Sequence, residues 1–564
     1  MANQDFSSTV EISPTYYLDN FVALINNVHR RYHGILNEEE QGFRDDFLAL
    51  PTNAQCLFVR LVSRKGPLFR ADRLSYAEID ALDAALGCLV DSELILLNPK
   101  IPASVALNLL TLDELRARFP ALPRSLRKAQ FITAASASFQ CADENIEQDL
   151  PTAEIIGRDI QLLLIAKPEV LDVFQLLYFG NTYQDLSEFV LSDLGVFNYE
   201  TYTLDGSATA FRSRQELEAL QQAIQFRQAV REAIDQEPVR LEALEAMVGP
   251  DGTFPAAQRT WSKALNELAR YREREGKHES ALALYRAAHY PPSRERIARI
   301  LYKDEAYKEA LRQCEEILQQ PWNEQEETSA IRIRDRCLKK LKRPVPVLPK
   351  AILREDKILL QAQTPAPVEL LGLELLTQEH RGEGYYVENW LFNGIFGLHF
   401  WEVIFAPVPD AFYHPFQRGP KDLYAPEFSE KRRDLLEGKL EQLTQGKGWH
   451  QTVLLKWREK HGRLNPFVHW SVLSEPLIER ALQRIPALHF ELVFRRMLKD
   501  LRHHCTGFPD LILFGPESGY DLVEIKGPGD RLQDHQRRWL EFFAVNRIPA
   551  RVVYLERASG LCGF

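Results

Sequence analysis

One segment near the carboxyl end constrains the fold of this 564-residue chain more than any other. It reads GFPDLILFGPESGYDLVEIKGPGD over residues 507–530, where two apolar runs flank a turn that contains Gly515, Pro516 and Gly519. Short apolar runs joined by such residues predict a β-hairpin. Pro509 sets the direction of the chain as it enters the first strand, because its ring fixes φ. The segment therefore predicts two neighbouring strands of a sheet.

The sequence on either side of this hairpin completes an α/β domain. Residues 369–380 and 387–405 are expected to form apolar helices, residues 535–543 another helix, and RVVYLE at 551–556 a third strand. Two strands, a helix and a strand, preceded by a long helix, predict a small mixed sheet. We therefore expect a multi-domain chain that is mostly α, with an α/β domain at its carboxyl end.

Three charged side chains gather at one end of the predicted hairpin. Glu524 and Lys526 are two residues apart in the second strand and share a face, and strand pairing can bring Asp510 beside Glu524. Two carboxylates, helped by the backbone carbonyl of Ile525, can hold a hard cation such as Mg²⁺ or Mn²⁺. Such a metal would polarise a scissile phosphate, and Lys526 could orient or help deprotonate the attacking water. Taken alone, Glu-x-Lys would more simply be explained as the solvent-exposed face of an amphipathic strand, but its position after Pro-Asp favours a catalytic role.

Basic residues that could bind nucleic acid occur in two amino-terminal segments, although the net charge of the chain is −10. In FVRLVSRKGPLFR (58–70), basic residues are interleaved with aromatic ones, which suits a nucleic-acid backbone. Residues 111–132 predict two short helices, the second basic, which resemble a SAP-type DNA-binding module. A basic helix end before a Gly-Pro turn, and an ordinary helical packing unit, are the alternatives. The candidate phosphate-binding residues are Arg60, Arg64, Lys65, Arg127 and Lys128.

The chain is expected to divide into several domains. At about 150 residues per domain, its length predicts three or four. The segments LARYREREGKHESALALYRAA (268–288) and IARILYKDEAYKEALRQCEEI (297–317) align at an offset of 29 residues, which predicts tetratricopeptide-like helical hairpins. A Pro-rich stretch at 344–351 ends this region, because helix cannot continue there. The expected domains are a helical DNA-binding region (1–100), a SAP-like or winged-helix-like region (101–240), helical repeats (241–345) and the α/β domain (346–564).

The cysteines and the amino terminus bear on the cellular location. Seven cysteines are scattered and never spaced C-x-x-C, which argues against a disulfide framework and a structural zinc site and predicts a reducing compartment. No apolar run reaches the ~18 residues that span a bilayer, and the first residues do not read as a signal peptide. We therefore expect no membrane association, and a location in the cytoplasm and nucleoid of a bacterium or the nucleus of a eukaryote.

The motifs together resemble a known class of nuclease. Pro509-Asp510 followed by Glu524-x-Lys526 is the pattern of the PD-(D/E)xK nuclease superfamily, and GFPDLILF, VEIKGPGDRL and His535-Gln536 resemble its virus-type replication-repair nuclease branch. YYLDNFVALINNVHRRY, FVRLVSRKGPLFR and FGLHFWEVIF, in this order, resemble the Fanconi-associated nuclease family. The resemblance implies a metal-dependent, structure-specific DNA endonuclease that cuts 5′ flaps and branched DNA, has 5′ to 3′ exonuclease activity and acts in interstrand crosslink repair.

The resemblance also implies roles for individual residues. Glu388 would be a further metal ligand, with Glu383 as the alternative, and Gln536 would lie beside the site and orient water or metal-bound groups. Arg502 matches a position that helps to hold a 5′ phosphate in some relatives, whereas His535 stands where those relatives have lysine. Larger family members begin with a ubiquitin-binding zinc finger, and no Cys/His ligand set precedes residue 16 here. We expect a compact, bacterial type of member.

The expected partner is branched or flapped DNA, and the sequence identifies no protein partner. Two other functions are compatible with the same residues. One is a Holliday-junction or restriction-like endonuclease, which would keep the fold and change the substrate. The other is a catalytically inactive scaffold, in which the helical repeats bind proteins.

Overall fold

The chain forms two compact units, residues 1–197 with 209–211, and residues 198–208 with 212–564. In this computed structural model the described residues are 13–64, 66–139, 149–204, 208–235, 241–247, 249–250, 252–347, 351–360, 366–380, 382–446 and 448–557. The fold class is the expected one, because helices predominate and an α/β domain stands at the carboxyl end. The four domain boundaries stay predictions.

The first unit consists of short helices and two small antiparallel sheets. Its three-stranded sheet has the order β1-β5-β2, and β3 pairs with β4. Helix α1 buries Phe21, Leu24 and Val28, whose spacing of three and four residues places them on one face. The elements are α1 (Tyr16–Tyr32), α2 (Glu38–Ala49), α3 (Thr52–Val62), β1 (Leu68–Arg70), α4 (Leu82–Asp91), β2 (Ile95–Leu97), β3 (Lys100–Pro102), α5 (Ala103–Asn108), α6 (Leu112–Arg118), α7 (Lys128–Ser136), β4 (Asp149–Pro151), α8 (Thr152–Ile156), β5 (Leu162–Ile165), α9 (Pro168–Phe179) and α10 (Ser187–Asp193), with short 3-10 helices at Ala71–Arg73 and Ala137–Phe139.

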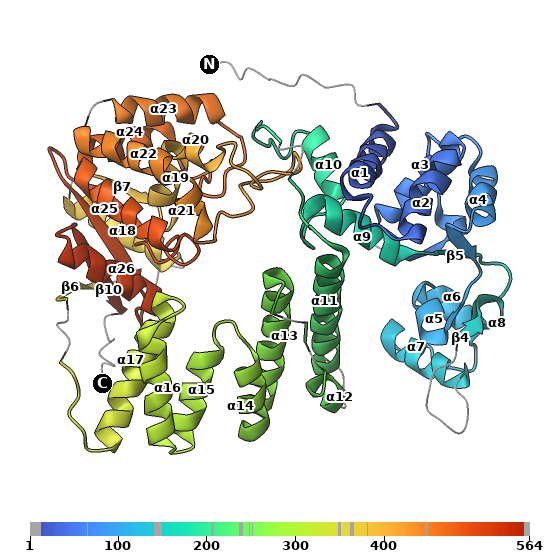
Figure 1. Ribbon diagram of the computed structural model, residues 1–564, viewed down its shortest axis with the longest axis horizontal. Helices are drawn as coiled ribbons and strands as arrows, with labels where there is room; N and C mark the ends of the chain where they lie inside the picture. The colour runs from blue at the N-terminus through green and yellow to red at the C-terminus, as the bar shows by residue number, and fades with distance from the viewer. Residues whose placement is uncertain are drawn as a thin grey trace, which may run out of the picture. The chain divides into compact units, whose positions relative to one another are not determined.

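The second unit begins with the helical repeats, which stand side by side in Figure 1. Helices α13 and α14 form one hairpin and α15 and α16 the next, as the offset of 29 residues predicted. Ala281 of α14 and Ala310 of α16, which match at that offset, are both fully buried. Small residues at these positions let the helices pack closely. The helices are α11 (Arg214–Asp235), α12 (Glu242–Glu245), α13 (Pro255–Arg274), α14 (His278–Ala287), α15 (Ser293–Lys303), α16 (Tyr307–Gln319) and α17 (Glu324–Lys340).

The α/β domain is built on a five-stranded sheet of order β6-β10-β9-β8-β7. Strand β10 is parallel to both of its neighbours, whereas β8 is antiparallel to β9 and β7, so the sheet is mixed as predicted. The predicted hairpin is β8–β9, with Leu511 opposite Val523 and Phe514 opposite Tyr520. The strands are β6 (Arg354–Leu360), β7 (Glu383–Tyr386), β8 (Leu511–Phe514), β9 (Tyr520–Lys526) and β10 (Ala550–Arg557).

Helices cover both faces of this sheet. Helix α18 packs on the face formed by Val523, Ile525 and their neighbours, and a Cβ on Gly372 would lie 2.7 Å from Ile525 Cδ1. The opposite face, which includes Leu522, joins the large core of the domain with α19, α25 and α26. The helices are α18 (Val368–His380), α19 (Trp390–His399), α20 (Trp401–Ile404), α21 (Glu427–Lys431), α22 (Arg433–Gln445), α23 (Trp449–Lys460), α24 (Glu475–Arg484), α25 (Ala487–Lys499) and α26 (Asp534–Val545).

The structure differs from the sequence-based expectation at several places in this domain. Strands β6 and β7 were not expected, and the helix expected over 387–405 begins only at Trp390 and divides into α19 and α20. Strand β7 reads EGYY, a short run without apolar alternation, and β6 reads REDKILL. Both are edge strands, where charged residues are tolerated because one side faces no neighbouring strand.

Two expectations about the whole chain can be compared with its described part. The cysteines described there, Cys56, Cys88, Cys314, Cys337 and Cys505, are free thiols. Cys141 and Cys562 lie outside the described residues. Among the described helices, none combines the length and the apolar character needed to cross a membrane.

Candidate active site

Asp510 and Glu524 lie opposite each other at one end of the β8–β9 hairpin. The register that pairs Leu511 with Val523 places them so when it is continued by one residue. Oδ2 of Asp510 accepts a hydrogen bond from the Ile525 N–H at 2.9 Å, and the Lys526 ammonium lies 2.7 Å from Oε1 of Glu524. The hairpin thus brings together two carboxylates and one cation.

Burial governs the electrostatics of these carboxylates. Desolvation raises the pKa of Asp510 to about 6, against the hydrogen bond from Ile525 that lowers it. Desolvation and the charge of Asp510 raise the pKa of Glu524 to about 8, against the attraction of Lys526. Glu524 is fully buried, and its Oε2 has no hydrogen-bond partner among the described residues. A site of this kind favours a bound cation, because added positive charge offsets the cost of burying two carboxylates close together.

Glu388 approaches this pair from the junction between β7 and α19. Glu388 was expected within the helix over 387–405, but it precedes α19. Its φ of +37° is unusual for a residue with a side chain. The backbone N–H groups of Val387 and Glu388 both donate to the carbonyl oxygen of Asp510, at 2.8 and 2.9 Å. The charge of Glu388 raises the pKa of both Asp510 and Glu524, so the three carboxylates lie within electrostatic reach of one another.

Glu383, the alternative to Glu388, has a different partner. Its Oε1 lies 2.6 Å from Nη2 of Arg480, and the Arg480 contact lowers the pKa of Glu383. A carboxylate held in this way is a poorer candidate ligand than Glu388.

Three residues that interact with Glu388 or Asp510 were not predicted from the sequence. Tyr386 donates its hydroxyl to Oε2 of Glu388 at 2.8 Å. Asn389 donates to Oε1 of Glu388 at 3.3 Å, and its own Oδ1 accepts from the backbone N–H of Gly507 and Phe508. Glu369, in the first turn of α18, contributes to the raised pKa of Asp510. Of the three, only Glu369 had a sequence signal, a carboxylate in a first turn that is followed by the apolar run LLGL.

The remaining predicted site residues lie on α26 and on the loop between α25 and β8. Oε1 of Gln536 accepts the Gln533 N–H at 3.0 Å, so its side chain closes the first turn of α26. His535 packs against Gly507, where a Cβ would meet the His535 carbonyl oxygen at 2.8 Å. Arg502 is exposed, with its Cζ 5.2 Å from the Tyr424 ring centroid. It lines a groove of about 560 Å³ together with Arg259, Tyr290, Trp322, Tyr424, Lys499 and His503.

The amino-terminal candidates for phosphate binding differ in how strongly their side chains are bound by other residues of the chain. Arg60 forms an ion pair with Glu78 at 2.5 Å and lies over the Tyr17 ring, so its charge is largely engaged within the unit. Arg64 is exposed and donates to the Tyr76 hydroxyl at 3.1 Å. Lys65 lies outside the described residues.

The second of the two short helices expected over 111–132 was expected to carry Arg124, Arg127 and Lys128, and it begins later than expected. Helix α7 begins at Lys128, so Arg124 and Arg127 precede it, because the residues after Pro123 form a turn. Arg127 is exposed at the N-cap, and the Lys128 ammonium donates to the Asn108 carbonyl at 2.7 Å.

The carboxylate oxygens of the site fit a hard divalent cation, although the side chains are not arranged in a complete coordination shell. In the described part of the chain, no three His, Cys, Asp or Glu side chains are arranged to hold a metal ion. The side chain of Glu524 instead contacts Lys526. Carboxylate oxygens, one of them buried without a hydrogen-bond partner, nevertheless match the chemistry that Mg²⁺ and Mn²⁺ prefer.

A mixed sheet with Asp510 opposite Glu524, and Lys526 beside them, defines a nuclease domain of the PD-(D/E)xK class. Family models support this class: the VRR-NUC domain matches residues 445–556, and the FAN1 HTH domain matches residues 15–96.

Whole-chain comparisons identify the family. The chain is 36% identical to a Fanconi-associated nuclease 1 homolog of Pseudomonas aeruginosa, covering 96% of each chain. It is 26% identical to the Arabidopsis thaliana homolog, covering 93% of this chain and 65% of the plant protein. The crystal structure of paFAN1 bound to 2-nt 5′ flap DNA with a gap superposes with a TM-score of 0.90 at 34% identity, covering 97% of this chain and 99% of that one. The chain belongs to the Fanconi-associated nuclease family and is a DNA nuclease, of a domain type that generally depends on divalent metal.

Proposed function

We propose that this nuclease cuts 5′ flaps and related branched DNA, removes nucleotides in the 5′ to 3′ direction and acts in interstrand crosslink repair. The observation that carries the proposal is the convergence of Asp510, Glu524 and Lys526, in a chain that matches a flap-bound relative over 97% of its length. Mg²⁺ or Mn²⁺ is the proposed cofactor.

The proposed ligands are Asp510, Glu524, the carbonyl of Ile525 and Glu388. When bound, the metal would polarise the scissile phosphate and lower the pKa of a bound water. Lys526 would release its contact with Glu524, orient the attacking water and stabilise negative charge on the phosphate. Gln536 would need to exchange its capping bond with Gln533 for a contact with water or substrate.

Contacts to DNA would come mainly from phosphate recognition. Arg64, Lys65, Arg127 and Lys128 are proposed to bind duplex arms, whereas Arg60 would act chiefly by ordering Tyr17 and Glu78. Arg502 is proposed to bind phosphate in its groove. His535, which stands where some relatives have lysine, packs against Gly507 and does not line that groove. Sequence-specific readout is not expected, and affinity should fall steeply with salt because phosphate contacts release counterions.

Cleavage assays on defined DNA structures test the proposal. Wild-type protein with Mg²⁺ or Mn²⁺ should cut a 5′ flap, and Asp510→Ala should abolish cutting while leaving flap affinity nearly unchanged. Glu517→Ala, in the exposed turn of the same hairpin, is the matched control and should cut normally. Preference for an intact four-way junction would favour the resolvase alternative, and no cutting with either metal would favour the inactive scaffold.

A further inference from the structure

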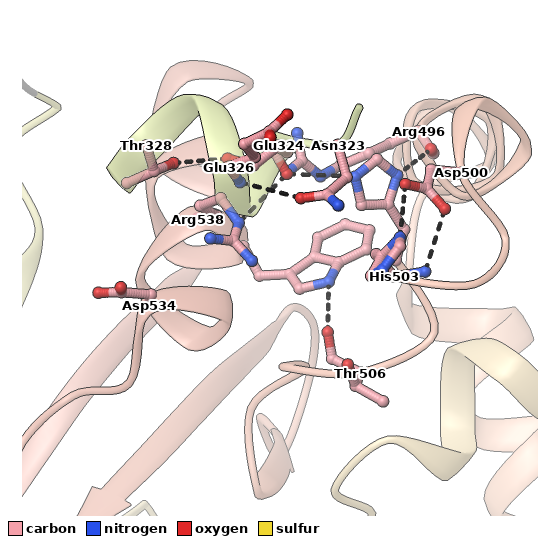
Figure 2. Close-up of polar contacts among 12 residues, drawn as sticks. Asn323, Glu324, Glu326, Thr328, Arg496, Asp500, His503, Thr506, Asp534 and Arg538 are labelled. Carbon is pink, nitrogen blue, oxygen red and sulfur yellow. Dashed lines mark hydrogen bonds and ion pairs between the residues drawn. The ribbon is translucent and has the colours of Figure 1, made fainter. Parts of the chain in front are cut away.

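Glu324, the first residue of α17, is the meeting point of three basic side chains from the α/β domain (Figure 2). Nη2 of Arg496, on α25, lies 2.8 and 2.7 Å from its two carboxylate oxygens. Nε2 of His504 lies 3.1 Å from Oε2, and Nε of Arg538, on α26, lies 3.3 Å from the same oxygen. One carboxylate of the helical repeats therefore contacts a helix, a loop and a second helix of the nuclease domain.

Helix α17 contacts α26 at a second point. Arg332 donates to both carboxylate oxygens of Asp534, each at 2.6 Å. At 1.5 Å of rise per residue, Arg332 lies about 12 Å along α17 from Glu324. Both partners of this pair are roughly two-fifths exposed, so the pair alone stabilises little, but its two hydrogen bonds fix direction. Two contacts along one rigid helix define both the position and the tilt of α26.

The elements held by α17 are those that lead into the active site. His504 lies on the loop between α25 and β8 that reaches Asp510, and Asp534 begins the helix that carries Gln536. The loop and this helix also pack on each other, since Trp539 Nε1 donates to the Thr506 carbonyl at 3.1 Å (Figure 2). A shift of either element would therefore move the other.

We infer that α17 is a positioning element of the nuclease site, in which Glu324 and Arg332 hold α26 and the loop that leads to Asp510 in fixed positions relative to each other. This inference rests on the proposed function, which assigns the chemistry to the site around Asp510. Glu324 carries most of the effect because the guanidinium groups of its two arginine partners are partly buried: Nε of Arg496 and Nη1 of Arg538 are buried and have no hydrogen-bond partner among the described residues. Without the carboxylate, the positive charges of Arg496 and Arg538 would repel each other and separate α25, which leads into the loop, from α26.

The first test compares Glu324→Gln with Glu327→Gln, an exposed residue on the same helix. Glu324→Gln keeps the shape of the side chain and removes its charge. We expect its single-turnover cleavage rate to fall by about 10- to 100-fold, as small displacements in an active site can do, with flap affinity changed by less than about twofold. In metal-free protein, amide exchange should accelerate over the loop 500–510 and the start of α26 and stay unchanged over α13 and α14. Glu327→Gln should match the wild type in every measurement.

The second test reverses an ion pair. Arg332→Asp should lower the cleavage rate by placing an anion against Asp534, and Arg332→Asp combined with Asp534→Arg should recover part of that loss. Recovery would require the contact between the two helices, because neither substitution restores any other pairing.

The results separate this inference from the proposed function. A normal rate for Glu324→Gln, no recovery in the double variant, or faster exchange throughout the second unit would each overturn the positioning role. Full activity of Asp510→Ala would instead contradict the proposed function. If Asp510→Ala is inactive and Glu324→Gln is normal, the proposed function stands and the inference falls.

Discussion

The side-chain oxygen of Asn389 accepts a hydrogen bond from the backbone N–H of Gly507 at 2.8 Å, across 118 residues of sequence. The same oxygen accepts from Phe508, while the amide nitrogen donates to Glu388. The Asn389 side chain therefore links Glu388 to the loop that enters β8. Because Glu388 and Asp510 lie on these two segments, Asn389 fixes the spacing between two proposed metal ligands.

Asn389→Ala should weaken this connection. The substitution leaves two backbone N–H groups without an acceptor, which costs roughly 1–3 kcal/mol of stability when such groups are buried. We expect a lower apparent affinity for Mn²⁺, measured by calorimetry with catalytically inactive Asp510→Asn as the reference for a damaged site.

Asn389→Asp separates the two halves of the contact. A carboxylate still accepts from Gly507 and Phe508 but cannot donate to Glu388 and repels it. Stability should be retained while Mn²⁺ affinity changes. Equal stability loss in the Asp and Ala variants would contradict this assignment.

Gly507→Ala should disturb the approach of α26 to the loop. Gly507 has a φ of +96°, and an added Cβ would lie 2.8 Å from the carbonyl carbon and oxygen of His535. Both backbone strain and this contact oppose the substitution, so we expect a loss of about 1–3 kcal/mol in the free energy of unfolding. Urea unfolding measures the loss, and Gly519→Ala, at a positive φ with no neighbouring atom within 4 Å, separates strain from contact.

Glu524→Gln should remove the stabilising effect of metal. A ligand that binds only the folded protein raises the melting temperature, so Mn²⁺ should stabilise the wild type. The neutral amide lacks the charge that attracts the ion, and the shift in melting temperature should shrink or disappear together with cleavage. Retention of the full shift would show that the ion binds elsewhere.

The sequence predicted those parts of the site that depend on neighbouring residues. The β8–β9 hairpin follows from two apolar runs and a turn, and its register places Asp510 opposite Glu524. The repeats follow from matched alanines at a fixed offset. Strand β7 could not be predicted in this way, because EGYY has no alternating pattern and pairs with β8 across more than a hundred residues.

The remaining contacts of the site depend on packing between distant segments. The positive φ of Glu388 occurs where two backbone N–H groups donate to the Asp510 carbonyl. No glycine stands at this position to indicate a positive φ in the sequence. Asn389 is an ordinary polar residue in the sequence, and only the tertiary structure brings Gly507 to it. Likewise, residues 332–343 contain several basic side chains, of which Arg332 is the first, but nothing in the neighbouring sequence indicates Asp534 as the partner of Arg332.

Acid should abolish the difference between the wild type and Glu324→Gln. Burial raises the pKa of Glu324, but the hydrogen bond from His504 and the charge of Arg496 outweigh it and lower the pKa from 4.5 to about 2. Arg538 also faces this carboxylate, and the Arg332–Asp534 pair lies farther along α17. A group with a lowered pKa in the folded state stabilises it fully above the unfolded value and loses this contribution as the pH falls toward the folded value.

The difference in the free energy of unfolding between the two proteins should therefore be fully present at about pH 5 and disappear between pH 4.5 and 2, where the carboxylate becomes protonated. Urea unfolding at a series of pH values measures the difference, and Glu327→Gln provides the baseline for removing an exposed carboxylate from the same helix. A difference that stayed constant down to pH 3 would mean that the charge of Glu324 does not stabilise the contact between α17 and the nuclease domain.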